Sequence, residues 1–279
     1  MREKLPSWYA WNTLKWIFLM VMLLAALLPL GWLLVSSLRT NLEIQTSPLG
    51  WPHKAQWGNY AKAISMGNLP RLFINSILVS LFAVVLNIAV TSLAGFVLSR
   101  EQFRGRELLH TILTAGVLIP IIAFMVPYFT LITKIKFYDT LLALILVYGS
   151  VNIPVSIFLI TAFMKSIPRE LEEAAIIDGC SFAKRFFGII FPLSQSGIAT
   201  AGTFCFIYSW NEFIQALLLT NSLKARTIQL GIKFFTSQFI TDYSSMYAAL
   251  IITIIPGVAV YVFLHDKIIG GLTAGSVKG

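Results

Sequence analysis

The chain has 279 residues, of which 57% are hydrophobic and 12% are charged, and its mean hydropathy is +0.79. Soluble domains carry about 25% charged residues, so this composition excludes a water-soluble globular protein and indicates a surface covered largely by lipid. The formal charge of +9, from 21 Lys and Arg against 12 Asp and Glu, therefore indicates loops beside anionic headgroups rather than nucleic-acid binding.

Six stretches are long and apolar enough to cross a bilayer, which requires about 20 residues. The first is too long for the apolar core of a signal peptide, and no small-residue cleavage site follows it, so we expect an uncleaved anchor. The sequence thus predicts an all-α polytopic membrane protein with a single transmembrane domain over residues 1–279. The six predicted spans are 16–38, 72–98, 108–133, 140–163, 198–220 and 247–264.

Basic residues set the expected orientation. The densest cluster, Arg100, Arg104 and Arg106, lies between the second and third spans. Short loops rich in Lys and Arg stay in the cytoplasm. Counting six spans from this loop places both the N-terminus and the C-terminus on the cytoplasmic side.

Polar residues inside the spans are the candidates for a solute path. Glu212 is the only acid well inside a predicted span, and a charge there costs roughly 2.5–3.5 kcal/mol unless it faces protein or water. Together with Trp210 and Asn211 it would offer hydrogen bonds and an aromatic face to a sugar. Alternatively, it forms a structural clasp or marks a break in the helix. Tyr148 and Asn152 form a weaker polar group in the fourth span.

Between the fourth and fifth spans, segment 164–197 has the pattern of a helical hairpin. Pro168 suits the first turn of a helix, and Gly179 suits its end. Acidic side chains in the first turns face the positive end of the helix dipole: Glu170, Glu172 and Glu173. An apolar stripe follows on a second helix, which Pro192 closes: Phe182, Phe186, Ile189 and Ile190. This stripe either packs on the chain's own helix ends or docks another protein.

Cysteine and histidine indicate neither a metal site nor a disulfide framework. Cys180 and Cys205 are isolated, and the three histidines follow no metal-ligand spacing. We therefore expect no metal and no catalytic residues in this chain. The nucleotide-binding pattern GxxxxGK[ST] does not occur either, so the chain is not expected to bind ATP itself.

The hairpin carries a spaced motif: Glu173-Ala174-Ala175, three residues, Gly179, nine residues, Ile189, one residue, then Phe191-Pro192. This motif resembles the EAA loop of ATP-binding-cassette (ABC) importer permeases, with Phe191 where the general pattern has Leu. Four further stretches resemble the second permease subunit of the maltose-type, carbohydrate-uptake branch. They are Asn75-Ser76, Arg100 with 103–106, 210–213 and the tail 271–279.

The resemblance implies the type I ABC importer permease fold, with segment 164–197 as a cytoplasmic coupling-helix hairpin. The implied partners are a second permease subunit in a heterodimer, two ATPase subunits that bind ATP and Mg, an extracytoplasmic solute-binding protein and a sugar substrate. Membrane lipid surrounds such a chain, and nucleic acid is not a partner. The implied location is the cytoplasmic (inner) membrane of a bacterium or an archaeon.

The resemblance also assigns roles to two groups of residues. Those implied to couple the permease to the ATPase are Glu170, Glu173, Ala174, Ala175, Asp178, Gly179, Phe182, Phe186, Ile189 and Pro192. The C-terminal tail, 265–279, is implied to reach the ATPase pair through Gly275, Lys278 and Gly279.

Three other interpretations are weighed against this one. A self-contained channel or secondary transporter would be expected to have intramembrane charge pairs or inverted repeats, which the sequence lacks. An integral membrane enzyme would need a second acidic set facing that of the hairpin. An importer of the same class could also carry a non-sugar solute, such as a glycerol phosphodiester.

Overall fold

The computed structural model describes residues 6–235 and 241–274, and the regular elements in these ranges are helical, which confirms the predicted all-α class. Short 3₁₀ turns and one π turn (Phe186–Ile190) lie between several of the helices. The helices are α1 (Pro6–Ser37), α2 (Asn41–Thr46), α3 (Gly58–Ser65), α4 (Leu69–Arg100), α5 (Arg106–Ala115), α6 (Met125–Lys134), α7 (Leu141–Val151), α8 (Ile153–Ser166), α9 (Glu170–Ile177), α10 (Phe182–Arg185), α11 (Phe191–Leu193), α12 (Gln195–Asn211), α13 (Ile214–Leu219), α14 (Ile228–Gly231) and α15 (Tyr243–Ala274).

Among the residues that the structure describes, three helices are long and apolar enough to span a bilayer, namely α1, α4 and α15. Three further candidate spans each consist of two helical stretches joined at a bend. The bends measure 103° between Arg106–Leu118 and Ile121–Lys134, 47° between α7 and α8, and 75° between Phe182–Leu193 and α12. Six candidate spans result when each bent pair is counted as one.

The bends and breaks occur where helical hydrogen bonding is interrupted. Pro120 has no N–H and disfavours a helical conformation at Ile119, whose backbone is extended (φ −86°, ψ 122°). Pro154 lies in the first turn of α8, directly after the bend. Within the predicted span 198–220, α12 ends before Glu212, whose backbone is extended (φ −69°, ψ 127°), and α13 follows from Ile214.

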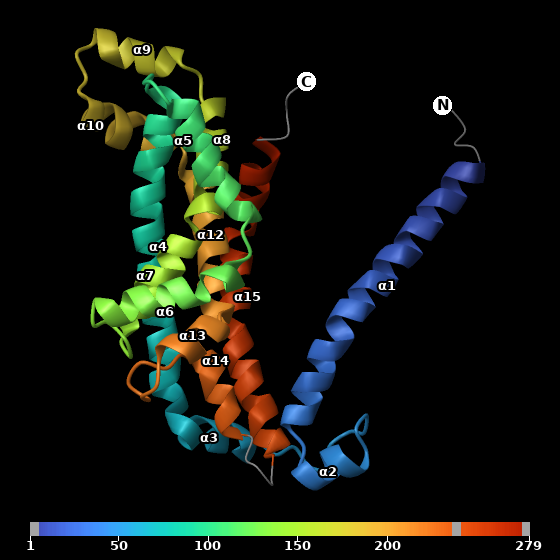
Figure 1. The fold of residues 1–279 in the computed structure, drawn as a ribbon. Helices are drawn as coiled ribbons and strands as arrows, with labels where there is room; N and C mark the ends of the chain where they lie inside the picture. The colour runs from blue at the N-terminus through green and yellow to red at the C-terminus, as the bar shows by residue number, and fades with distance from the viewer. Residues whose placement is uncertain (1–5, 236–240, 275–279) are drawn as a thin grey trace. The chain divides into compact units, whose positions relative to one another are not determined.

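The chain divides into two compact units, of which the larger comprises residues 68–233 and 253–279. Helix α4 is central in this unit and packs against α7, α8 and α12 (Figure 1). Its N-terminal half contributes to one apolar cluster, with Val79, Leu144, Val147, Tyr148 and Leu219. Its C-terminal half contributes to another, with Phe96, Ile160, Phe186 and Ile190.

Helices α8 and α12 of this unit approach closely because Gly197 has no side chain. A Cβ atom added at Gly197 would lie 2.6 Å from both the Cβ and the Cγ of Phe163. At Gly202, also on α12, the nearest neighbour of an added Cβ would be the Val84 Cγ1, at an ordinary 3.5 Å. The packing therefore requires glycine at the first position and not at the second.

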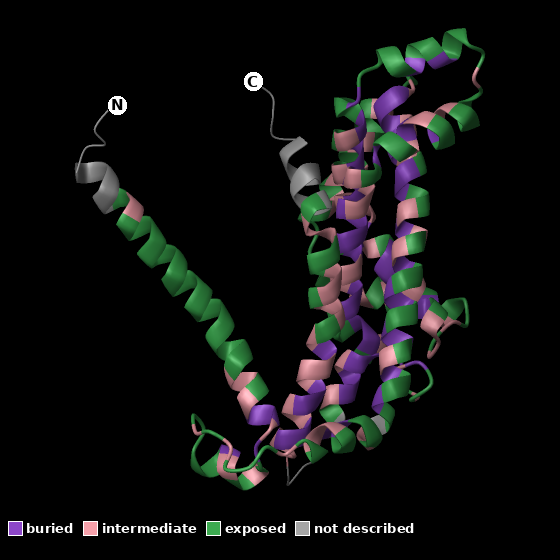
Figure 2. Ribbon diagram, turned by 180° about the vertical axis from the view of Figure 1, so that it is seen from behind, coloured by how far each residue is buried: buried purple, intermediate pink, exposed green. Residues whose placement is uncertain are grey.

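The smaller unit comprises residues 1–67 and 234–252. The most apolar stretch of α1 has no buried residues, and Figure 2 shows the helix exposed over most of its described length. At the end of α1, the buried Arg39 guanidinium donates to the carbonyl oxygens of Glu43 and Ser47, both at 2.5 Å. This contact holds the loop after α2 against the helix end.

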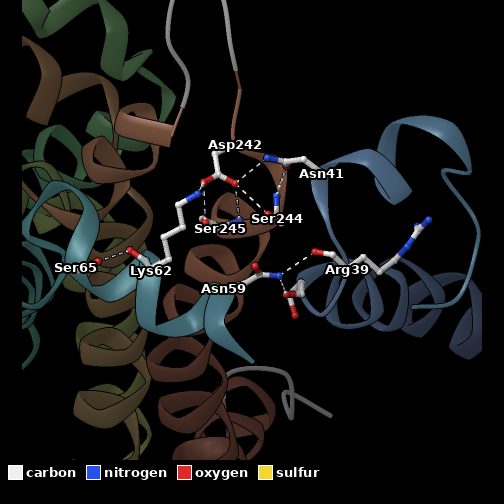
Figure 3. A network of polar contacts seen from close by, with 9 residues as sticks. Arg39, Asn41, Asn59, Lys62, Ser65, Asp242, Ser244 and Ser245 are labelled. Atoms are coloured by element: carbon white, nitrogen blue, oxygen red, sulfur yellow. Dashed lines mark hydrogen bonds and ion pairs between the residues drawn. The ribbon is translucent and has the colours of Figure 1, made fainter. Parts of the chain in front are cut away.

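A polar network in the smaller unit is centred on Asp242, directly before α15 (Figure 3). Its carboxylate pairs with the Lys62 Nζ at 2.6 Å and accepts hydrogen bonds from Asn41, Ser244 and Ser245. Burial alone would raise the pKa of Asp242. The Lys62 ammonium and the serine donors outweigh burial and hold this pKa well below its usual range.

Candidate functional site

The hairpin predicted over 164–197 forms at the C-terminal end of α4 (Figure 1). Helix α9 ends in a Schellman motif, in which the N–H of Cys180 donates to the Ala175 carbonyl (2.9 Å) and the N–H of Gly179 to that of Ile176 (3.0 Å). Gly179 has φ +75°. The prediction that this glycine ends the helix is confirmed, and its backbone conformation is one that is costly for other residues.

The apolar stripe of the second half packs on the chain itself. Phe186 and Ile190 are buried beside Phe96 of α4, and Ile189 packs against the same cluster. The ring of Phe182 meets that of Phe96 edge-on, with the centroids 5.0 Å apart. Phe186 and Ile190 thus pack on the chain's own helix ends, as one of the two interpretations predicts, whereas Phe182 stays 42% exposed. Phe186 is therefore not accessible to a partner, contrary to its assignment as a coupling residue.

Helix α9 presents the accessible face of the hairpin. Glu170, Glu173, Ala174 and Asp178 are exposed there, whereas Ala175 is buried. Three apolar side chains that the sequence-based assignment missed are also exposed: Leu171, Ile176 and, at 85%, Ile177. The Ile176-Ile177 pair in the last turn of the helix was the available signal. Beyond the turn, Pro192 of α11 is exposed as well. Acidic and apolar side chains thus adjoin on one short helix.

The polar residues predicted to line a solute path inside the spans come together only in part. The Tyr148 hydroxyl of α7 donates to the Glu212 Oε2 at 3.0 Å. The same carboxylate accepts hydrogen bonds from the N–H groups of Gln215 (2.8 Å) and Ala216 (3.0 Å) at the start of α13. Glu212 therefore marks a break in the span and caps the helix that follows, which confirms the helix-break alternative.

Asn152 contacts the residue that pairs with Glu212, Tyr148, whereas Trp210 serves in packing. The Asn152 side chain at the α7–α8 bend donates to the Tyr148 carbonyl at 2.8 Å. The Trp210 indole is 2% exposed, donates to the Thr253 carbonyl (3.0 Å), stacks on Phe206 and makes an edge contact with Phe73. Its predicted role as an aromatic face for sugar is corrected to one in packing, because the side chain is buried.

Two further polar side chains border the break. The exposed Asn211 side chain donates to the carbonyl of Ile207 in its own helix (2.8 Å). The ring of Tyr208, which the sequence-based prediction missed, meets that of Tyr148 edge-on at 6.2 Å. Spacing alone gave no signal for Tyr208, since tyrosine is common in these spans.

No group of three or more His, Cys, Asp or Glu that could hold a metal ion occurs among the described residues. The predicted tail contacts, Gly275, Lys278 and Gly279, lie outside the described residues. Helix α15 itself continues to Ala274, well past the predicted end of the last span.

Comparison with known proteins gives one family match. Residues 87–270 match the family model described as "Binding-protein-dependent transport system inner membrane component". The chain is 33% identical over 276 residues to the sulfoquinovosyl glycerol transport system permease protein SmoH of Agrobacterium fabrum, covering 99% of this chain and 97% of the relative. It is 32% identical over 275 residues to the trehalose/maltose transport system permease protein MalG of Thermococcus litoralis, covering 96% and 99%.

The fold is similar to a solved structure, that of a bacterial ABC transporter involved in the import of the acidic polysaccharide alginate. The match has a TM-score of 0.84 at 19% identity and covers 95% of this chain and 99% of the matched chain. At 19% sequence identity, this similarity shows that the two chains share a fold.

Proposed function

The chain belongs to the family of binding-protein-dependent transport system inner membrane components, and from this premise we propose that it imports a sugar or glycoside together with a second permease subunit. It is a multi-pass membrane permease of an ABC importer. The self-contained channel and the membrane enzyme considered above do not fit this family.

The proposed substrate class follows from two relatives that resemble the chain over nearly its whole length. One is named for sulfoquinovosyl glycerol and the other for trehalose and maltose, which are all glycosides. A sugar offers many hydroxyl groups, so it suits a path that presents carboxylate and phenol oxygens. We propose that the part-exposed Glu212 and the exposed Asn211 border this path, with Tyr148 and Asn152 buried behind Glu212. A glycerol phosphodiester is the alternative solute.

The proposed coupling element is the exposed face of α9, and this face is the observation that carries the coupling proposal. Glu170 and Glu173 are accessible together with the isoleucines of this helix, while Phe186 and Ile190 anchor the second half of the hairpin in the core. Buried apolar area and charge complementarity are the usual ingredients of a protein interface. We propose that an ATPase subunit binds here and supplies ATP and Mg, since the chain has no nucleotide-binding motif of its own.

The same proposal extends to the other subunits of the importer and to the orientation of this chain in the membrane. Two ATPase subunits bind on the cytoplasmic side, an extracytoplasmic solute-binding protein delivers the sugar, and the two permeases form a heterodimer. Both termini of this chain lie in the cytoplasm of a bacterium or an archaeon. Residues 1–279 act as one transmembrane domain, and the tail, with Gly275, Lys278 and Gly279, extends toward the ATPase pair.

Purification in mild detergent tests this proposal. The chain would be expressed with its genomic neighbours and purified through a tag, and co-purifying subunits would be identified. We expect a second permease and an ATPase, and we expect Glu173→Lys on the exposed face to release the ATPase only. Lys134→Glu, an exposed charge reversal outside the hairpin, should leave the complex intact.

Two results would contradict the proposal. A chain that purifies alone, or as an oligomer of itself, would exclude a heteromeric importer. Retention of the ATPase by Glu173→Lys would place its docking site elsewhere. Uptake of labelled trehalose, sulfoquinovosyl glycerol and a glycerol phosphodiester by cells carrying the whole operon separates the solute classes.

A further inference from the structure

We propose that Arg185 positions the hairpin for coupling by tying α9 to the end of α4, so that a displacement of α9 moves the membrane helices. This inference rests on the proposed docking of an ATPase on α9. The residues concerned are Arg185, Glu172, Glu101 and Arg100, which we call the hairpin brace. None of the four belongs to the residues proposed to contact the ATPase.

Arg185 bridges two carboxylates on different elements. Its Nη1 lies 2.6 Å from the Oε1 of Glu172 in α9, and its Nη2 lies 2.9 Å from the Oε1 of Glu101 directly after α4. Arg185 itself is the last residue of α10. One guanidinium therefore joins both halves of the hairpin to the central helix of the larger unit.

Arg100 extends the brace to α8. Its guanidinium is almost fully buried and donates to the carbonyl oxygens of Ile167, at 2.9 Å, and Met164. These are carbonyl groups at the C-terminal end of α8, where a helix leaves acceptors unpaired. The Arg100 Nε lies 3.7 Å from the Oε2 of Glu172. Glu172 thus faces both arginines.

Aromatic rings fix the plane of the Arg185 guanidinium. Its Cζ lies 5.9 Å from the ring centroids of both Phe96 and Phe182. A planar fork that contacts two carboxylates and two rings at once cannot be replaced by an ammonium group, which is a point charge. The site therefore requires arginine rather than any cation.

The brace has a mechanical consequence. It contains two cationic and two anionic side chains, three of them at most 15% exposed, so charges are balanced within a partly dehydrated cluster. Such clusters hold geometry more than they add stability, because desolvation offsets much of the attraction. Helix α9 has eight residues and cannot hold its position alone. The brace makes it move with α4 and α8.

The test uses the complete importer, with both permeases, the ATPase pair and the binding protein, reconstituted in liposomes. Glu101→Gln is the first variant, because this side chain is 35% exposed and its loss leaves the Arg185–Glu172 pair within the hairpin. We expect the ATPase to remain bound and the ATP hydrolysed per solute transported to rise about fivefold, the low end of typical coupling between sites.

Arg185→Lys should raise the same ratio, because a lysine cannot bridge both carboxylates. Lys184→Gln is the matched control, since this neighbouring side chain is exposed, and it should leave the ratio unchanged. Hydrogen exchange of the backbone amides in α9 should become faster in Glu101→Gln and Arg185→Lys while the membrane helices stay protected. That result separates a loosened hairpin from a misfolded chain.

An unchanged ratio in Glu101→Gln and Arg185→Lys, with unchanged exchange in α9, would overturn the brace. Loss of the ATPase in Glu101→Gln would also overturn it, because the brace would then serve docking rather than transmission. A wild-type chain that binds no ATPase would instead contradict the proposed function, so the two failures are distinguishable.

Discussion

Gly179 is the point of the hairpin at which a left-handed backbone conformation restricts the choice of residue. Its φ of +75° allows the Schellman hydrogen bonds that end α9. A Cβ added there would meet no atom within 4 Å. The cost of a substitution is therefore backbone strain alone, and it should depend on how well the new residue tolerates the left-handed region.

Gly179→Val should destabilise the end of α9 by about 1–2 kcal/mol, whereas Gly179→Asn should cost less because asparagine visits this conformation readily. Retention of the ATPase during purification and exchange of the Cys180 amide would measure the difference. Equal behaviour of the two variants would show that strain at this position does not govern the hairpin.

Asp242 is the residue whose charge state stabilises the smaller unit. Because its pKa is lower in the folded chain than in the unfolded chain, its contribution is complete above the unfolded value of about 4 and is lost as the pH falls through the folded value. Asp242→Asn should lower stability by about 1–2 kcal/mol at pH 7, since Lys62 is largely exposed and screened.

The difference in melting temperature between wild type and Asp242→Asn, measured in detergent, should stay constant from neutral pH down to mildly acidic pH. Below about pH 4 it should shrink, because the Asp242 carboxylate of the unfolded wild-type chain then takes up a proton before that of the folded chain does. Asp178→Asn, a change at an exposed aspartate of the hairpin, is the control. A difference that grows with acidity would contradict the lowered pKa.

At the scale of elements, contact between helices depends on small residues at defined points. Gly197→Ala should destabilise the larger unit by about 1–3 kcal/mol, because the new methyl group would overlap Phe163. Gly202→Ala on the same helix should be close to neutral or stabilising, since alanine favours helix and has room there. Thermal unfolding of both variants in the same detergent compares them directly.

At the scale of the whole molecule, the arrangement of loops across the membrane follows from charge and from the number of spans. Single cysteines would be introduced at Arg104 and at Lys54, with Cys180 and Cys205 replaced. A membrane-impermeant maleimide should label position 54 in intact cells and position 104 only after permeabilisation. The reverse pattern would invert the proposed orientation of both termini.

The sequence by itself determined the helical class, the candidate spans and the hairpin with its glycine stop. These features depend on local quantities, namely apolar length, basic clusters and turn chemistry, which a linear reading retains. The EAA-type spacing also indicates the permease family from the sequence alone, because spacing along a helix is itself a local property.

Only the tertiary structure decided which face of each element is free. It buried Phe186 and exposed Ile177, turned Glu212 into a helix cap, and placed Trp210 in packing. It also brought together Glu101, Glu172 and Arg185 from three elements. Such pairings join residues far apart in the chain, so they depend on how the helices pack and not on the order of residues along them.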